Sequence, residues 1–196
     1  MKEDYILQAH NSWSYLKPRK WWMKLLRFTA RCQSKTIQEQ YTNYEVRSFD
    51  LRVRFTKEDG LIIAHGPIEY DYNLIQIYSD LDMINRWGDC SVRILHEARN
   101  KKQYSGFSLD CFREFCRHLE EKYTGIKFFC GRNLYNWNVD YEFEYKPSME
   151  EKYSSVCPPK YLDDWFPWIY ARLNNRKNLE EGTDADILSI DFVNIQ

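Results

Sequence analysis

The stretch Val46-Arg47-Ser48-Phe49-Asp50-Leu51-Arg52-Val53 decides the fold, because it predicts an apolar strand that carries a carboxylate and a guanidinium. Asp50 and Arg52 lie two residues apart, and side chains with that spacing on a strand point to the same face. His10 and His65 each follow directly after another short apolar run. The sequence therefore places four ionisable groups on or just after predicted strands.

Outside residues 46–53, short apolar runs alternate with stretches of helical spacing, which is typical of a mainly parallel sheet. The predicted strands are 5–9, 46–53, 61–64, 92–95, 126–130, 141–145 and 187–193. The predicted helices are 21–30, 36–44, 74–87, 109–123 with Ser108 as its cap, and 162–174. Residues 146–160 are expected to replace one unit with a loop, and residues 174–186 to form a surface connection.

A full eightfold barrel of strands and helices takes about 250 residues, and this chain has 196. The sequence therefore predicts an α/β fold, an irregular or incomplete TIM-type (β/α) barrel. In such barrels the functional side chains project from the carboxyl ends of the strands. We expect His10, Asn11, Asp50, Arg52 and His65 to meet at that end.

The composition indicates one globular domain over residues 1–196, because 43% apolar and 17% aromatic content supports one substantial core. The formal net charge of -1 gives no overall attraction for nucleic acid, and no nucleic-acid partner is expected. The apolar runs are far shorter than the roughly 20 residues of a membrane span. Residues 1–16 lack a secretory apolar block, so we expect a cytoplasmic protein or a trimmed secreted form.

Six cysteines are present without any C-x-x-C pair. Cys111 and Cys116 lie five residues apart, which is a poor spacing for one helical face. A zinc site and a catalytic thiol are both open alternatives, but buried free thiols fit the pattern better. Free thiols are in keeping with a reducing compartment.

His10 and His65 together indicate a catalytic site more strongly than either histidine alone. A single histidine after a strand commonly packs or caps, and that interpretation stays open for each one alone. Cleavage of a phosphodiester by a neighbouring hydroxyl needs a base, an acid and a cation for the phosphoryl charge. His10, His65 and Arg52 supply these three groups.

The ordered segments resemble a known family over residues 5–70. They are Ala9-His10-Asn11-Ser12, Phe28-Thr29-Ala30-Arg31-Cys32-Gln33, residues 46–53 quoted above, and Ile63-Ala64-His65-Gly66-Pro67. Together they look like the catalytic X region of phosphatidylinositol-specific phospholipases C, closest to the bacterial, metal-independent branch. The resemblance implies a phospholipid or phosphodiester substrate that is cleaved through a cyclic phosphate.

By this resemblance, His10 is the general base on the inositol 2-hydroxyl and His65 is the general acid for the leaving oxygen. Arg52 stands where eukaryotic members carry a calcium-binding carboxylate, so no metal or cofactor is expected, calcium included. Asp50 would orient Arg52. Asn11 is a candidate substrate contact and departs from the bacterial aspartate that pairs with the acid histidine.

Three further positions follow from the same resemblance. Asp191, on the last predicted strand, matches an aspartate that hydrogen-bonds to the base, although an exposed aspartate at a strand end is an open alternative. Arg93 and His96 fall where the family has a basic residue that holds phosphate or substrate hydroxyls. Glu45 replaces a glycine that is usual in relatives and is expected to alter a turn at most.

A basic stretch from Lys17 to Lys35 contains seven cations and no acidic residue. Trp21 and Trp22 lie at its centre, beside Lys20 and Lys24, and this combination suits a helix on an anionic membrane surface. The alternative is that the tryptophans pack in the core beneath a solvated basic face.

Two rival functions remain open. A metal-dependent glycerophosphodiester phosphodiesterase shares a barrel with two histidines, but it would need a different set of residues where Asn11, Arg52 and Gly66 stand. A catalytically inactive lipid-binding barrel is the other rival. The sequence favours a phosphoric diester hydrolase or lyase of the phospholipase C type.

Overall fold

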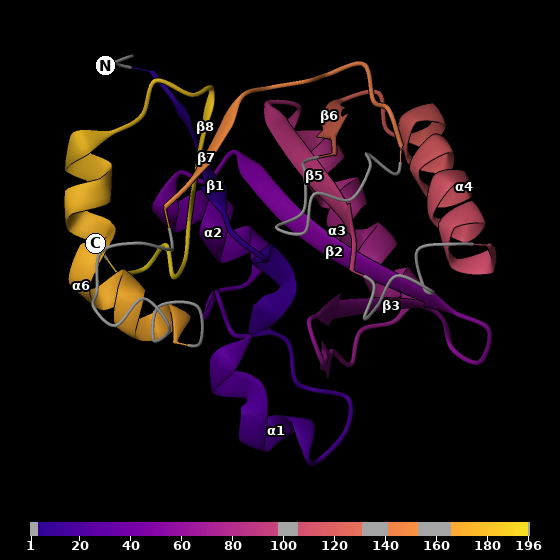
Figure 1. The fold of residues 1–196 in the computed structure, drawn as a ribbon. Coiled ribbons are helices and arrows are strands. Elements are labelled where there is room, and N and C mark those ends of the chain that lie inside the picture. Colours follow the sequence, from indigo (N-terminus) through magenta and orange to yellow (C-terminus); the bar gives the residue numbers. More distant parts are fainter. Residues whose placement is uncertain (1–3, 98–105, 131–140, 153–165, 196) are drawn as a thin grey trace.

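The computed structural model describes residues 4–97, 106–130, 141–152 and 166–195 (Figure 1). Its strands are β1 (Ile6–Ala9), β2 (Ser48–Thr56), β3 (Gly60–His65), β4 (Ile68–Glu69), β5 (Cys90–His96), β6 (Ile126–Phe129), β7 (Met149–Glu151) and β8 (Ile187–Ile190). Its helices are η1 (Ser12–Tyr15), α1 (Met23–Leu26), η2 (Arg27–Thr29), α2 (Ile37–Tyr44), α3 (Leu74–Trp87), α4 (Phe107–Lys122) and α6 (Pro167–Glu181).

The sheet is mainly parallel and curled. Its parallel strands lie in the order β7, β8, β1, β2, β5 and β6. Within the described residues, the end strands β6 and β7 do not pair with each other, so the curl stays open on that side. The predicted incomplete TIM-type barrel is confirmed.

The hairpin of β3 and β4 departs from the parallel pattern. β3 runs antiparallel to the second half of β2, with Val53 opposite Ile63 and Thr56 opposite Gly60. Gly60 has a φ of 66° at this turn, a conformation that glycine adopts without strain. The strand predicted at 61–64 is therefore confirmed, but it returns along β2 instead of following a crossover helix.

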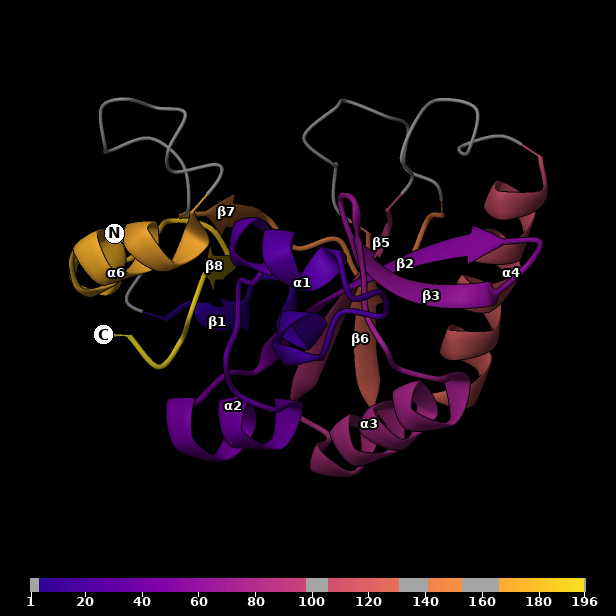
Figure 2. The ribbon, with the colours of Figure 1, turned by 90° about the horizontal axis from the view of Figure 1, so that it is seen from below.

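β2 separates the apolar core from the polar interior by simple alternation. Phe49 lies 6.2 Å from Trp87 of α3, and Phe55 lies 5.8 Å from Phe115 of α4, so the odd-numbered side chains face the helices. Asp50, Arg52 and Arg54 point to the opposite, concave face and are all buried. Figure 2 shows α2, α3 and α4 along the outside of the curled sheet.

Capping residues account for two of the predicted helices. Thr36 and Glu39 form a reciprocal capping box at the start of α2, and Asn73 and Gln76 form another at the start of α3. α3 has the predicted bounds and ends at Gly88, which has a φ of 76°.

Ser108 is not the cap of its helix. α4 begins at Phe107 with Gly106 as the N-cap, and the hydroxyl of Ser108 bonds to His96 within 2.8 Å. The prediction failed because a tertiary contact took the hydroxyl that a cap would use.

The basic stretch and the last helix also differ from expectation. Residues 21–30 form two short pieces, α1 and η2, instead of one helix. α6 starts at Pro167 and continues to Glu181, so the predicted surface connection over 174–186 is wrong for most of its length. Asn175 and Asn178 are buried because their side-chain amides bond to backbone or side-chain oxygens, and these contacts hold a polar helix face in the interior.

The strands nearest the open side were predicted least well. Residues 141–145 form no strand, although Phe143 is buried and its ring lies 5.9 Å from Phe128 of β6. β7 was expected to be loop, and its three residues are too short to show a period. The start of the helix predicted from residue 162 and residues 153–160 of the predicted loop lie outside the described residues.

Glu45 adopts a left-handed conformation with a φ of 56° at the C-cap of α2. Glycine is the usual residue there because it has no Cβ to clash with the backbone. The substitution therefore strains a turn and leaves the register of β2 intact. None of the described helices is both long and apolar enough to cross a membrane.

Candidate active site

His10 lies at the end of β1 and is held from both sides. Its Nδ1 is 2.7 Å from the carboxylate of Asp191, and its Nε2 is 2.6 Å from the guanidinium of Arg52. A carboxylate accepts and a guanidinium donates, so Nδ1 carries the proton and Nε2 presents a lone pair. His10 is therefore in the tautomer that a general base requires.

Asp191 is brought to His10 by the pairing of β1 with β8. Ala9 pairs with Ile190 at the ends of these strands. His10 and Asp191 directly follow the two paired residues, so the carboxylate of Asp191 reaches the imidazole of His10. Asp191 is buried, so the alternative of an exposed aspartate at a strand end is excluded.

Gln33 ties the ends of these two strands together. Its side-chain amide donates to the carbonyls of His10 and Ile190, at 3.2 and 3.0 Å, and its side-chain oxygen accepts from the N–H of Val193. Gln33 is fully buried, and it fixes the backbone on either side of the His10–Asp191 contact.

Asp50 is the anionic centre of the concave face. It accepts from the Asn11 N–H at 2.9 Å and from Arg52 Nε at 3.0 Å. Burial by itself would raise the pKa of Asp50, but Arg52, Arg93 and His10 outweigh it and hold that pKa well below its usual range. Asp50 therefore stays ionised and orients Arg52, as the sequence suggested.

Asn11 is at the site in an unusual conformation. Its φ of 44° is left-handed, which asparagine tolerates better than most residues, and it aims the Asn11 N–H at Asp50. Neither polar atom of its buried side-chain amide has a hydrogen-bond partner among the residues that the structure describes. The amide thus remains available to a bound molecule.

His65 reaches the site through the hairpin. Because Val53 pairs with Ile63, the chain returns along β2 and sets the ring of His65 at 5.9 Å from that of His10, edge to face. His65 Nδ1 lies 3.0 Å from the carbonyl of Ala30, which can only accept, so Nδ1 holds the proton and Nε2 is the free nitrogen.

The electrostatic surroundings of His65 disfavour its charged form. Burial, followed by the positive charge of Arg52, lowers its pKa to about 4, against the opposing influence of Glu97. Within the described part of the chain, no carboxylate holds the ring of His65 as Asp191 holds His10. His65 is therefore neutral at pH 7 and would carry a proton only when an anion lies beside it.

Arg54 and Glu97 hold the loop that follows His65. The guanidinium of Arg54 donates to the carbonyls of Gly66 and Glu97, at 2.6 and 2.9 Å, and pairs with Glu69. The carboxylate of Glu97 accepts from the Gly66 N–H at 2.8 Å and lies 3.8 Å from Arg52. Glu97 thus links the guanidinium of the site to the loop of the second histidine, a role that the sequence did not indicate.

Cys32 lies between the two histidine systems, with its sulfur 3.8 Å from His65 Nδ1. Burial and the charge of Asp191 raise the pKa of its thiol well above the usual value, so it is a poor nucleophile. His10, Cys32 and Asp191 offer ligand atoms within 4.8 Å of one another. Nitrogen, sulfur and oxygen together suit zinc better than calcium, which takes oxygen ligands. The absence of any metal requirement stays a prediction.

Arg93 lies beside this cluster, and His96 lies apart from it. Arg93 is on the concave face opposite Asp50 in register, but it is buried in an ion pair with Glu151 of β7. His96 lies on the other face, stacked at 4.9 Å on Phe112 of α4. The alternation of β5 turns His96 toward the helices, so the structure does not bring this predicted substrate contact to the site.

The predicted membrane residues are on the surface. Trp21 is 75% exposed and Trp22 is 39% exposed, and Lys20 and Lys24 are exposed beside them. The alternative of tryptophans packed in the core is therefore wrong.

Comparison with solved structures finds phosphatidylinositol-specific phospholipases C. The enzyme from Listeria monocytogenes is 16% identical, with 95% of this chain and 87% of that chain covered and a TM-score of 0.62. A variant of the Staphylococcus aureus enzyme is 14% identical, with 95% and 84% covered and a TM-score of 0.62. This chain has the fold of a phosphatidylinositol-specific phospholipase C.

A further structure of the S. aureus phospholipase C is described by the modulation of its membrane binding, with 13% identity, 95% and 85% covered and a TM-score of 0.60. No family model matches the sequence, and no curated protein sequence does. The phospholipase C fold confirms the architecture that the resemblance implied.

Proposed function

We propose that this chain is a phosphodiesterase that cleaves a phosphoinositide-like phosphodiester through a cyclic phosphate. One observation carries the proposal. The imidazoles of His10 and His65 lie 5.9 Å apart, and the guanidinium of Arg52 bonds to His10. A carboxylate holds the first ring and a backbone carbonyl holds the second. The fold it shares with bacterial phospholipases C supports the same class of reaction.

His10 is the general base in this mechanism. A substrate hydroxyl that displaces Arg52 from Nε2 meets a lone pair, and Asp191 stabilises the imidazolium that forms when the proton transfers. The displaced guanidinium remains anchored to Asp50 and faces the phosphoryl oxygens, whose negative charge it stabilises.

His65 is the general acid. Its free Nε2 is protonated when the phosphodiester anion approaches, because a nearby negative charge favours the imidazolium. It then gives the proton to the leaving oxygen, and the two histidines exchange roles when water opens the cyclic phosphate. Asn11 supplies an amide to substrate oxygens.

Product analysis tests the proposal. Phosphatidylinositol should give a cyclic inositol phosphate that later opens, at a rate that a chelator leaves unchanged, while a glycerophosphodiester without inositol should be cleaved poorly. Activity that a chelator abolishes and a divalent ion restores would identify the metal-dependent phosphodiesterase instead. Binding without any product would identify an inactive lipid-binding barrel.

We further propose that α1 contacts an anionic membrane surface through Trp21, Trp22, Lys20 and Lys24. Exposed tryptophans beside cations gain free energy both from apolar burial and from anionic lipid. Replacing both tryptophans with alanine should weaken sedimentation with phosphatidylglycerol vesicles by about tenfold or more. Ile75→Ala, which removes an exposed side chain from α3, is the matched control; equal binding of both variants would contradict the proposal.

A further inference from the structure

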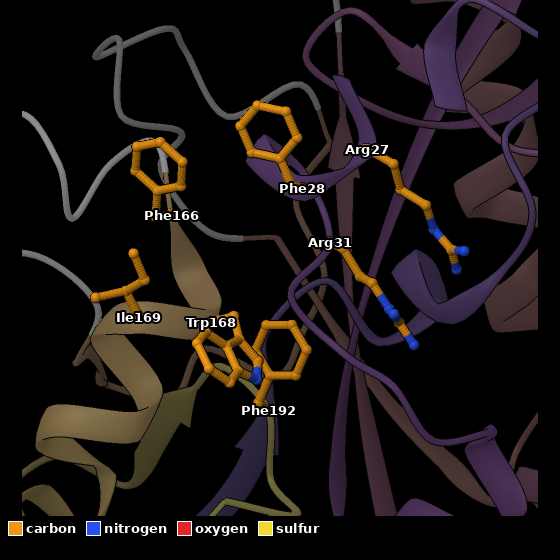
Figure 3. A pocket seen from close by; sticks show the side chains of 7 residues that line it. All are labelled: Arg27, Phe28, Arg31, Phe166, Trp168, Ile169 and Phe192. Atoms are coloured by element: carbon orange, nitrogen blue, oxygen red, sulfur yellow. The ribbon is translucent and has the colours of Figure 1, made fainter. Parts of the chain in front are cut away.

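A cavity lies outside the histidine cluster, between η2, the start of α6 and the end of β8. It has a volume of about 500 Å³ and is lined by Arg27, Phe28, Arg31, Phe166, Trp168, Ile169 and Phe192 (Figure 3). The rings of Phe28 and Phe166 stack at 5.5 Å across it. Local sequence patterns do not indicate this groove, because its two walls come from η2 and α6, which are far apart in the chain.

The groove is apolar on one side and cationic on the other. Figure 3 shows Phe166, Ile169 and Trp168 along the wall that α6 provides, and the side chains of Arg27 and Arg31 together on the facing side. Among the described residues, no carboxylate lies within 4.0 Å of either guanidinium.

The polar contacts of the two arginines are with backbone carbonyls. Arg27 Nη2 donates to the Tyr15 carbonyl at 2.5 Å, and Arg31 Nε donates to the Gln33 carbonyl at 3.2 Å. These bonds orient the guanidiniums without neutralising them. Two positive charges beside an apolar groove are complementary to a molecule with an acidic head and an apolar tail.

The groove is separate from the catalytic cluster, although one turn of chain lines both. Asp191 turns its carboxylate to His10, whereas the next residue, Phe192, turns into the groove with a φ of 46°. The N–H of Phe192 donates to the Cys32 carbonyl at 2.6 Å. This bond holds the backbone turn that points the two side chains in different directions.

The groove is continuous with an exposed apolar surface. Phe28 is 52% exposed, and Trp168 and Ile169 of its facing wall are 46% and 41% exposed. Leu25 of α1 and Leu173 of α6 are also exposed, at 68% and 61%. Such side chains beside unpaired cations favour contact with a bilayer, where both an acyl chain and an acidic headgroup are present.

We propose that this groove binds one anionic phospholipid of a membrane, with an acyl chain among the aromatic rings and the phosphate at Arg27 and Arg31. This lipid is distinct from a substrate at His10 and Arg52. The inference goes beyond phosphodiester cleavage, because binding in the groove needs no turnover.

Calorimetry with short-chain lipids below their micelle concentration tests the proposal. Dihexanoyl phosphatidylglycerol should bind with a stoichiometry of one and at least about tenfold more tightly than dihexanoyl phosphatidylcholine, since the guanidiniums bond to its acidic headgroup. Inorganic phosphate should give no measurable binding, because it lacks the acyl chain. The protein with His10→Ala should bind phosphatidylglycerol as the wild type does.

Matched variants separate the groove from general surface charge. Arg31→Gln and Phe166→Ala should each weaken binding by about tenfold. Lys17→Gln removes one charge from the same basic stretch at an exposed position outside the groove and should leave the affinity unchanged. Thermal melts confirm that each variant is folded.

Equal affinity for the two lipids, or equal effects of Arg31→Gln and Lys17→Gln, would overturn the proposal in favour of unspecific attraction. Binding of inorganic phosphate as tight as that of the lipid would show a site for free anions instead. Because the measurement is of binding, a wild-type protein without phosphodiesterase activity would leave it valid.

Discussion

Replacing His10 with alanine should lower the turnover of a phosphatidylinositol analogue by on the order of 10² to 10⁴, the contribution of one acid or base group. The change removes the lone pair that accepts the proton of the attacking hydroxyl. It also leaves Asp191 and Arg52 without the imidazole that bonds to both of them. Asp191→Ala should cost less, because the base remains and loses only the carboxylate that orients it and stabilises its charge.

Steady-state kinetics with a water-soluble inositol phosphodiester measure this effect apart from membrane binding. His118→Ala is the matched control, because His118 is exposed on α4. Turnover by the His10→Ala protein within about twofold of the wild type, in preparations free of other phosphodiesterases, would exclude His10 as the base.

Acidification should destabilise the protein through His65. Its pKa is about 4 in the folded chain and 6.5 ordinarily, so between these values the unfolded chain binds more protons and stability rises with pH. The stabilisation is complete above pH 6.5 and is lost as the pH falls toward 4, by at most about 3 kcal/mol. Asp50 affects stability in a lower pH range. Because its pKa is depressed in the folded chain, its contribution to stability is lost only when the pH falls below 3.8, the ordinary pKa of an aspartate.

Urea unfolding at several pH values between 4 and 7 measures this dependence. His65→Gln removes the titrating ring, so its free energy of unfolding should vary less steeply with pH than that of the wild type. His118→Gln, on an exposed helix face, should keep the slope of the wild type. Equal slopes for the wild type and His65→Gln would show that burial does not hold this imidazole neutral.

Much of the fold was predictable where periodicity and caps agree. The alternation of Asp50 and Arg52 with apolar neighbours predicted a strand with one polar face, and β2 has that face. The bounds of α3 were predicted without error, because its apolar spacing lies between an asparagine cap and a glycine stop. The prediction missed β7, because a strand of three residues is too short to show a period of two. It also ended α6 too early, because the buried face of that helix consists of asparagines, which are typical of polar loops.

Most of the predicted site residues meet in the structure, but His96 does not. His10, Asp50, Arg52, His65 and Asp191 meet at one end of the sheet, as expected for residues on or just after strands. His96 does not join them, because one step along β5 reverses the face. Arg93 shares the concave face but is paired with Glu151.

Residue type and periods of two or 3.6 residues are local properties of the chain. They were enough to predict which side chains share a strand face and which groups have the chemistry of a base, an acid and a cation. Tertiary contacts were needed to show that β3 folds back to bring His65 beside His10, and that Gln33 joins the ends of β1 and β8. They were also needed to show that η2 and α6 enclose the groove at Arg31. Those contacts join residues up to 160 positions apart, and no local pattern records which distant segment a loop will meet.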